Sequence, residues 1–429
     1  MWLLDKMLGK LIRRGQLIVT DFGGKEYRYG DAAADPVRIR FTDKRAAFDI
    51  AKDPRLGAGE SYMDGRLVVE PPHDIRDMIL LVMGNAGRPG QKLEAPSAVK
   101  RTVDRIASRL DQINFRGRAS ANVVHHYGLT REFYELFLDE DRMYSMGYYR
   151  DPANSLERAQ IDKKALIAAK LYLQPGASAG CRVLDIGCGW GGFGLFLNRH
   201  YGCDVLGVSL APDQVKFANE RAEAAGVAER VKFQLIDYRD VVGLFDRISS
   251  IGMIEHLGKG HYGEYFSKCF DLLADDGVML THTIGRVGPP GPTDAWARKF
   301  IFPGHYLPAL SEMVTPAEDS GWEVADAEVL RYHYAYTLAE WYRRTTLHEA
   351  EITAMFDSRF FRMWQFYLAG TEQGFRFANL VNFQLQTVKQ RSAVPMMRDY
   401  IEPEALRLSA LEEAPVWHLE RKMRSSGCD

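Results

Sequence analysis

The spacing of hydrophobic and polar residues near the N-terminus is typical of a small domain of strands and helices. Apolar and polar residues alternate on both sides of Gly23-Gly24, a pair that favours a tight hairpin turn. The predicted strands are residues 16–22, 25–31, 36–41 and 66–70, and the predicted helices are 44–53 and 74–83. We therefore expect an α+β domain over residues 1–90.

Residues 2–14 predict an amphipathic helix. At helical spacing one face carries Leu4, Met7, Leu8 and Leu11, and the opposite face carries Lys6, Lys10 and Arg13. Such a helix suits peripheral contact with an anionic membrane surface. It suits packing against its own domain equally well, and the sequence leaves both interpretations open.

From about residue 160 the pattern changes to helices alternating with short apolar strands. The predicted strands are 182–187, 204–210, 231–237, 246–254 and 277–285, and the predicted helices are 160–173, 191–202, 213–226 and 262–273. This order predicts a parallel sheet covered by helices on both faces. Helical, aromatic-rich sequence after about 290 reads as an insertion followed by C-terminal elements.

The composition adds a domain count and excludes several protein classes. A chain of 429 residues is long enough for two domains. Its net charge of −2 excludes a strongly basic nucleic-acid binder, although residues 91–118 hold seven Lys or Arg against three acids. We expect a basic linker over 91–120. The five cysteines lack CxxC spacing, which predicts neither a metal site nor a disulfide framework and favours a cytoplasmic location. The sequence contains no run of 18 apolar residues, so we expect no membrane-spanning helix.

A glycine-rich turn marks the candidate cofactor site. Asp185-Ile186-Gly187-Cys188-Gly189-Trp190-Gly191 lies between a predicted strand and a helix, where glycines let a ligand approach the backbone and the helix N-terminus. The GxGxG spacing differs from the GxGxxG of dinucleotide enzymes. The next strand ends in Val208-Ser209-Leu210 without a ribose-binding acid, which also disfavours NAD. A purely structural glycine turn is the alternative.

The turn is one of several ordered blocks that resemble a known family. DIGCGWGG resembles motif I of class I S-adenosylmethionine (SAM) methyltransferases. HHYGLTREFYELFLDEDRMYSMGYY, VLDIGCGWGGF, GVSLAPDQ, DRISSIGMIEHLG, THTIG, IFPG and YAYTLAEW are similar, in order, to blocks of the cyclopropane-fatty-acyl-phospholipid synthases and mycolic-acid methyltransferases. The resemblance implies a Rossmann-like α/β fold with a mostly parallel seven-stranded sheet over 121–429 and a helical insertion around 290–375.

The resemblance also implies which residues hold SAM. The matching positions are Tyr144, Ser145, Gly187, Gly189, Ser209 and Gln214, with Asp185 at the start of motif I and Tyr238 covering the adenine. For the two tyrosines, ordinary packing in an aromatic core is the alternative.

The family's reaction implies a second set of residues. Methyl transfer to an alkene generates a carbocation in the acyl chain, which a dry, aromatic-lined cavity can stabilise. Closing a cyclopropane ring then requires a base, and the family's bound bicarbonate implies the polar positions Glu255, His282 and Tyr334. Glu255 and His282 each follow or end a predicted strand, where ligands bind in open α/β sheets.

Two departures from the family pattern leave the product open. Met146 and Thr371 stand where the family has cysteines. Cyclopropane formation on an unsaturated phospholipid is expected, with a methyl-branched or methylene fatty acid as an alternative. Other readings are a SAM methyltransferase for a soluble small molecule and a non-catalytic lipid-binding protein. We expect an enzyme at the inner membrane surface that binds no nucleic acid, and a homodimer remains open.

Overall fold

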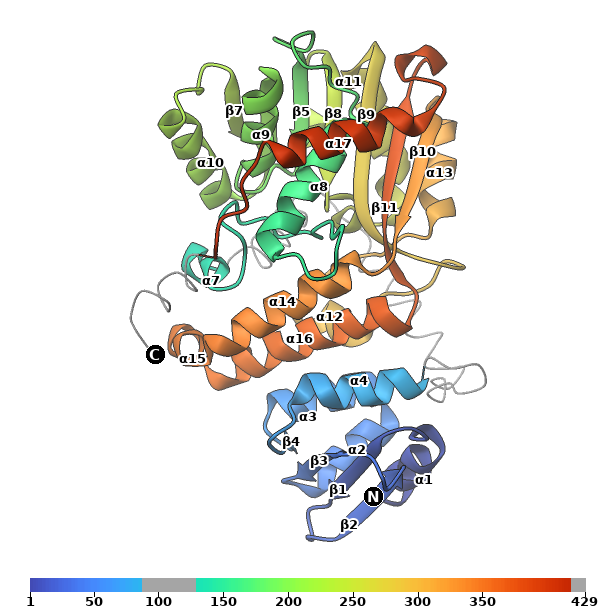
Figure 1. The fold of residues 1–429 in the computed structure, drawn as a ribbon. Helices are drawn as coiled ribbons and strands as arrows, with labels where there is room; N and C mark the ends of the chain where they lie inside the picture. The colour runs from blue at the N-terminus through green and yellow to red at the C-terminus, as the bar shows by residue number, and fades with distance from the viewer. Residues whose placement is uncertain (87–128, 418–429) are drawn as a thin grey trace. The chain divides into compact units, whose positions relative to one another are not determined.

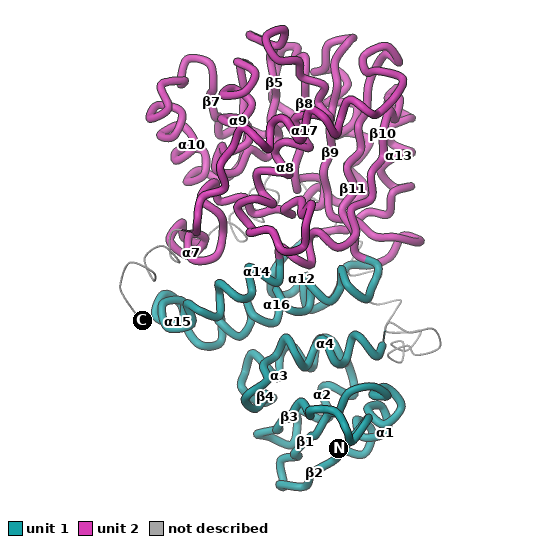
Figure 2. Tube along the Cα trace, in the orientation of Figure 1, with its two compact units in different colours: residues 1–110, 292–303, 338–379 teal, residues 111–291, 304–337, 380–429 magenta. Residues whose placement is uncertain are grey.

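A computed structural model of the chain describes residues 1–86 and 129–417. The chain forms two compact units (Figure 2). Unit 1 comprises Met1–Leu110, Pro292–Pro303 and Leu338–Asn379, and unit 2 comprises Asp111–Gly291, Gly304–Thr337 and Leu380–Asp429. The predicted basic linker at 91–120 and the boundaries at its ends lie outside the described residues, so that division stays a prediction.

Unit 1 begins with a four-stranded sheet of order β2-β1-β3-β4. Its strands are β1 (Gln16–Thr20), β2 (Glu26–Gly30), β3 (Pro36–Phe41) and β4 (Leu67–Val69). The hairpin predicted at Gly23-Gly24 is present, because β1 pairs antiparallel with β2 and Gly24 has a φ of 84°. The strand β3 pairs parallel with β1, a crossover that the sequence pattern did not indicate.

The N-terminal helix α1 (Trp2–Leu11) turns its apolar face into unit 1. Leu4, Leu8 and Leu11 are all buried, whereas Trp2 and Leu3 are exposed. Of the two interpretations left open by the sequence, packing on its own domain is the one that applies to this face. Any contact with a membrane through α1 must therefore use its outer side.

The remaining helices in the described part of unit 1 come from distant parts of the chain. They are α2 (Lys44–Lys52), α3 (Pro54–Met63), α4 (Ile75–Ala86), α12 (Ala295–Phe300), α15 (Glu349–Met355), α16 (Ser358–Phe377) and most of α14 (His333–Leu347). Arg76 on α4 reaches the fully buried carboxylate of Glu372 on α16 with two hydrogen bonds, of 2.6 and 2.8 Å. The described parts of the predicted helical insertion thus contribute to two units, since residues 304–337 belong to unit 2.

Unit 2 is built on a seven-stranded sheet, counted over the described residues, of order β10-β11-β9-β8-β5-β6-β7. Its strands are β5 (Arg182–Ile186), β6 (Asp204–Ser209), β7 (Val231–Leu235), β8 (Phe245–Ile251), β9 (Leu273–Arg286), β10 (Glu323–Leu330) and β11 (Leu380–Val388). The strands β5 to β9 run parallel, and β11 joins β9 and β10 antiparallel. The predicted fold class is confirmed. The sequence pattern missed β10, an edge strand inside the segment that was expected to be helical.

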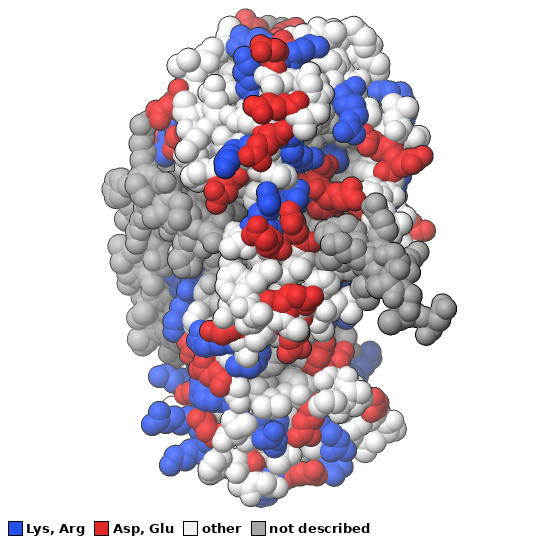
Figure 3. All heavy atoms as spheres, turned by 90° about the vertical axis from the view of Figure 1, so that its left-hand side faces the viewer, with Lys and Arg blue, Asp and Glu red and all other residues white. Residues whose placement is uncertain are grey.

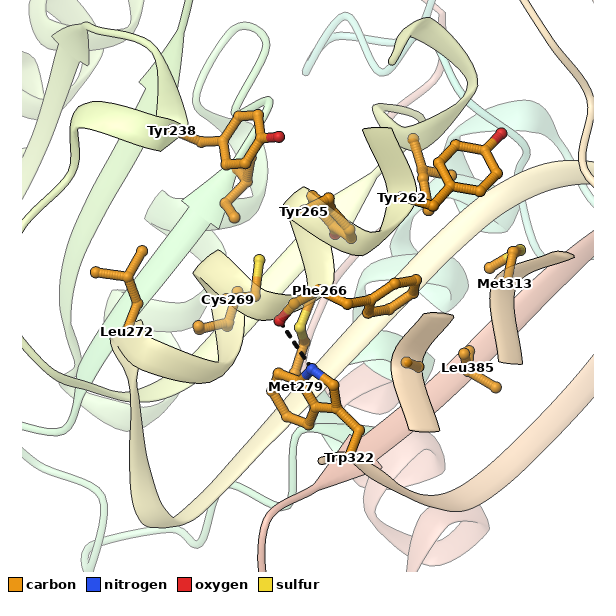
Figure 4. Close-up of a cluster of buried hydrophobic side chains, with 14 of the residues drawn as sticks. Tyr238, Tyr262, Tyr265, Phe266, Cys269, Leu272, Met279, Met313, Trp322 and Leu385 are labelled. Carbon is orange, nitrogen blue, oxygen red and sulfur yellow. Dashed lines mark hydrogen bonds between the residues drawn. The ribbon is translucent and has the colours of Figure 1, made fainter. Parts of the chain in front are cut away.

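Helices cover both faces of this sheet (Figure 1). One core contains Val183, Val205 and residues of α8 (Leu156–Lys170), α9 (Gly192–Tyr201), α10 (Pro212–Ala224) and α17 (Ile401–Ala410). The other contains Leu184 and Ile248 with residues of α11 (Tyr262–Leu272) and α13 (Leu310–Asp319). Figure 4 shows part of this second core, where the Trp322 indole donates a hydrogen bond of 2.9 Å to the Phe266 carbonyl.

Two further features concern the charges on the surface and the length of the helices. Lys and Arg are interspersed with Asp and Glu over the face drawn in Figure 3. Among the helices of the described ranges, none is long and apolar enough to cross a membrane. In unit 2, the carboxyl ends of the parallel strands share one edge of the sheet, which is where the candidate site is expected.

Candidate active site

The glycine-rich turn joins β5 to α9. Gly187, Gly189 and Gly191 have φ values of 81°, 53° and 81°, a region that residues with a side chain rarely adopt. A Cβ on Gly191 would lie 2.7 Å from the Phe233 ring, so only glycine fits there. Beside Gly189, by contrast, no described atom lies within 4 Å of where a Cβ would stand. The turn therefore offers open backbone at the N-terminus of a helix, as a cofactor cradle requires.

The end of β6 is tied to this turn. The N–H groups of Gly187 and Cys188 both donate to the Val208 carbonyl, at 2.9 and 3.1 Å. Ser209 is the last residue of β6, and its Oγ accepts the Ala211 N–H at 3.2 Å. Two of the residues predicted to bind SAM, Gly187 and Ser209, are thereby held close together.

Two further predicted residues lie in or beside these elements. Asp185 on β5 is buried and accepts a hydrogen bond of 2.7 Å from the Ser249 hydroxyl. Burial raises the pKa of the Asp185 carboxyl to about 6. Gln214 is buried in the first turn of α10.

The Tyr144-Ser145 pair lies in a segment that side chains of α8 bind through hydrogen bonds. Gln160 donates to the carbonyls of Met143 and Ser145, at 3.3 and 2.9 Å. Lys163, fully buried, donates to Ser145 Oγ at 2.9 Å. Burial lowers the pKa of the Lys163 ammonium to about 7. The sequence reasoning missed both residues of α8, because a lysine in a helix is ordinarily read as part of its solvated face.

The same segment is anchored to the start of α14. The Gly147 N–H donates to Thr337 Oγ1 at 2.9 Å, and the Tyr149 N–H donates to His333 Nδ1 at 3.1 Å. The rings of Tyr148 and His333 stack with centroids 4.7 Å apart. Tyr334 follows directly and is buried. The predicted SAM pair and Tyr334 are thus placed on segments that hydrogen-bond to each other.

Glu255 lies in a short 3-10 helix, η2 (Ile254–His256), after the carboxyl end of β8. Only 2% of its surface is exposed. Its Oε1 accepts the Ile284 N–H of β9 at 2.6 Å, while Oε2 is buried without a hydrogen-bond partner in the described parts of the chain. Burial raises the pKa of the carboxyl to about 7. A carboxyl group with a pKa near 7 and one oxygen without a hydrogen-bond partner is suited to form a hydrogen bond with a ligand.

His282 lies on β9, two residues before Ile284, whose N–H the Glu255 carboxyl accepts. It pairs with Ile251 of β8, and its carbonyl accepts the Gly252 N–H at 2.8 Å. Its imidazole is buried between amides of β11, with Gln384 Nε2 3.1 Å from Nδ1 and Asn382 Nδ2 3.5 Å from Nε2. Burial, reinforced by the charges of Lys163, Lys170 and His333, lowers the pKa of His282 to about 3. The ring is therefore neutral at physiological pH.

Of the three predicted polar residues, Glu255 follows β8 and accepts the N–H of Ile284, two residues beyond His282 on β9. Tyr334 lies at the start of α14 in the same unit, next to His333. The amides Asn382 and Gln384 were missed. The signal available in the sequence was a polar residue at every second position of an otherwise apolar strand, LVNFQLQTV.

The other predicted positions lie in packed surroundings. The Tyr238 ring belongs to a buried core and meets the Tyr265 ring at 5.7 Å and 69°, as in ordinary aromatic packing. Tyr144 packs edge-on against Tyr134, with centroids 5.6 Å apart. Met146 is fully buried beside Ser145 in unit 2, whereas Thr371 lies on α16 in unit 1. The SAM-binding roles of the two tyrosines stay predictions.

Comparison with known proteins gives the family of this chain. The profile of the family described as mycolic acid cyclopropane synthetase matches residues 115–385. The cyclopropane-fatty-acyl-phospholipid synthase of Escherichia coli K12 is 34% identical over 83% of this chain and 88% of its own length. A probable fatty acid methyltransferase of Pseudomonas putida is 37% identical over 62% of this chain and 68% of its own length.

Solved structures agree with the same assignment. The cyclopropane synthase MmaA2 of Mycobacterium tuberculosis is 28% identical and covers 62% of this chain and 97% of its own, with a TM-score of 0.59. The mycolic acid cyclopropane synthase CmaA1, solved with SAH and CTAB, is 31% identical over 62% of this chain and 97% of its own, also with a TM-score of 0.59. The resemblance predicted from the ordered blocks is confirmed, and the chain belongs to the mycolic acid cyclopropane synthetase family.

Proposed function

We propose that this protein transfers the methyl carbon of SAM to the double bond of an unsaturated fatty-acyl chain on a phospholipid and closes a cyclopropane ring. The printed activity of the E. coli relative, which matches most of both chains, supports this substrate class. The observation that carries the proposal is the buried, half-satisfied carboxyl of Glu255, bonded to β9 two residues beyond His282, in the unit that holds the glycine turn.

SAM is held, in this proposal, by the glycine turn and the segments tied to it. Gly187 and Gly189 give access to backbone N–H groups, and Asp185, Ser209 and Gln214 line the ends of β5 and β6. Tyr144 and Ser145 complete the set, with Tyr238 beside the adenine. Lys163 and Gln160 keep the Ser145 segment in place.

The polar residues also fit a bound bicarbonate. The unfilled Glu255 Oε2 can accept the bicarbonate hydroxyl, while His282 and Tyr334 can donate to its oxygens. A buried anion needs such donors because an unpaired charge is costly away from water.

The chemistry needs both groups. When bound, SAM supplies an electrophilic methyl, and bicarbonate supplies a base for the proton released as the ring closes. The chain itself orients the methyl donor and excludes water from the carbocation. In unit 2 Tyr148 is half-buried and Tyr149 is buried, both contact His333, and their rings are candidates to face the acyl chain.

The experiment that tests the function is expression in a host with monounsaturated phospholipids. We expect lipid acyl chains that gain one CH₂ and lose the alkene, with cyclopropyl methylene protons in the NMR spectrum. A methyl-branched or methylene product would contradict ring closure, and SAM turnover only on soluble molecules would contradict the lipid substrate.

Access to phospholipid requires contact with a membrane, and we propose that the outer side of α1 makes it. Trp2 is 70% exposed and Lys6 lies 4.1 Å from its ring centre, while Lys10, Arg13 and Arg14 are also exposed. An aromatic ring next to basic side chains is typical of peripheral contact with anionic lipid at the inner membrane surface.

Co-sedimentation with liposomes of anionic phospholipid tests this contact. Binding should weaken with salt, because each Lys or Arg near the surface contributes about 1 kcal/mol. It should fall several-fold in Trp2→Ala, because the helix loses apolar area that inserts among the lipids. Val242→Ala, an exposed apolar substitution in unit 2, is the control. Equal binding to neutral and anionic vesicles would contradict the electrostatic contribution to membrane binding. Sedimentation velocity would show separately whether the protein that binds is a homodimer.

A further inference from the structure

The strand β11 carries an unusual row of buried amides. Asn382, Gln384 and Gln386 alternate along it on one face, and each is at most 1% exposed. The antiparallel register with β9 places Gln384 directly opposite His282 and Asn382 opposite Ile284. Buried amides are costly unless their donors and acceptors are used, so each needs a reason.

The burial of Gln386 has a structural reason. Its Nε2 donates to the Lys170 carbonyl of α8 and, at 2.8 Å, to the Tyr400 hydroxyl. This amide ties the sheet to its covering helix. It does not contact His282, and it therefore provides a matched control for the other two.

Gln384 contacts His282, one of the three predicted catalytic residues. Its Nε2 lies 3.1 Å from His282 Nδ1, at hydrogen-bonding distance. The imidazole is neutral because burial disfavours its charged form, and Lys163, Lys170 and His333 lower its pKa further. A neutral ring has one donor and one acceptor nitrogen, so a hydrogen bond donated to Nδ1 leaves the proton on Nε2.

Asn382 lies at the other ring nitrogen. Its Nδ2 is 3.5 Å from His282 Nε2, too long for a good hydrogen bond. With the proton on Nε2, both groups are donors and cannot bond to each other. Two neighbouring N–H donors of this kind can be satisfied by one shared acceptor, such as an anion's oxygen.

We propose that Gln384 fixes the tautomer of His282 with the proton on Nε2, and that Asn382 adds a second N–H donor to the anion that His282 holds. Gln384 is then a positioning residue that acts through His282, and Asn382 is a binding residue. The inference rests on the proposed function, because the anion is the bicarbonate proposed above.

The tautomer is tested on the full chain without any ligand. We would label histidine with ¹⁵N, assign the His282 signals by their loss in His282→Gln, and read which ring nitrogen carries hydrogen. The proton should be on Nε2 in the wild type and in Gln386→Leu. In the isosteric Gln384→Glu, whose carboxylate can only accept, it should move to Nδ1. A wild-type proton on Nδ1, or a Gln384→Glu spectrum like the wild type, would overturn the role of Gln384.

The anion contact is tested by turnover against bicarbonate concentration in buffer otherwise free of CO₂. Asn382→Leu and Asn382→Asp should raise the bicarbonate concentration for half-maximal rate by about tenfold or more, since each removes a hydrogen bond donated to a buried anion. SAH affinity should be unchanged. Gln384→Glu should lower kcat by a similar factor, whereas Gln386→Leu should not.

An unchanged bicarbonate dependence in both Asn382 variants would refute the contact. If the wild type itself does not respond to bicarbonate, the anion of the proposed function fails and the Asn382 role with it, whereas the ¹⁵N result still decides the role of Gln384.

Discussion

Replacing Glu255 with glutamine changes the charge of a buried group without changing its shape. The carboxyl is 2% exposed, and its pKa rises from the ordinary 4.5 to about 7 chiefly because of burial. One pKa unit corresponds to about 1.4 kcal/mol, so ionising Glu255 destabilises the folded chain by about 3 kcal/mol. Glutamine keeps an oxygen for the Ile284 N–H and never ionises.

The sign follows from proton binding. Between the unfolded pKa near 4.5 and the folded pKa near 7, the folded chain binds more protons than the unfolded chain. Stability therefore falls as pH rises through this window. The free energy of unfolding of Glu255→Gln, minus that of the wild type, should increase by about 3 kcal/mol from about pH 4 to about pH 8.

Chemical denaturation of the full chain at several pH values, followed by fluorescence and circular dichroism, measures this difference. Glu223→Gln, an exposed substitution in α10, controls for the loss of one charge. A difference that does not change with pH would refute the reasoning, because the carboxyl would then be hydrated. The same variant should lose most methyl transfer while binding SAH as the wild type does; loss of SAH affinity would mean that Glu255 belongs to the cofactor site.

Three other substitutions test the structure around the site and in unit 1. Lys163→Met should weaken SAH binding about tenfold in calorimetry, since Ser145 loses its hydrogen bond and a charge-assisted bond contributes about 1.5–3 kcal/mol; unchanged affinity would contradict the role of α8. Gly191→Ala should lower the free energy of unfolding by about 2 kcal/mol or more through overpacking, whereas Gly226→Ala, with a similar φ and open space, should cost about 1 kcal/mol. Glu372→Gln should destabilise unit 1 by about 3 kcal/mol because it removes the buried negative charge that pairs with Arg76 and Arg376, and a change below 1 kcal/mol in thermal unfolding would contradict this.

The fold and the family were predictable because their signals are local. The glycine turn follows a short apolar strand, and the positive φ values at Gly187 and Gly191 are conformations that glycine favours. Helices between apolar strands predict a parallel sheet wherever they occur. The hairpin at Gly23-Gly24 was predictable for the same reason, since a tight turn depends on the residues that form it.

The site's environment was decided by tertiary structure. Sequence blocks indicated Glu255, His282 and Tyr334, but their roles stay predictions. That Lys163 would hold Ser145, and that Gln384 would face His282 from 102 residues away, depends on how α8 packs and on the β9–β11 register.

The orientation of α1 was decided in the same way. Its pattern of apolar and basic residues fits a membrane surface and a protein core equally well. In the structure this face packs into unit 1, which buries Leu4, Leu8 and Leu11. Local sequence thus determined which elements form, because turns and periodicity act within a few residues. Only tertiary structure decided which side chains meet, because contacts between distant segments depend on the packing of the whole unit.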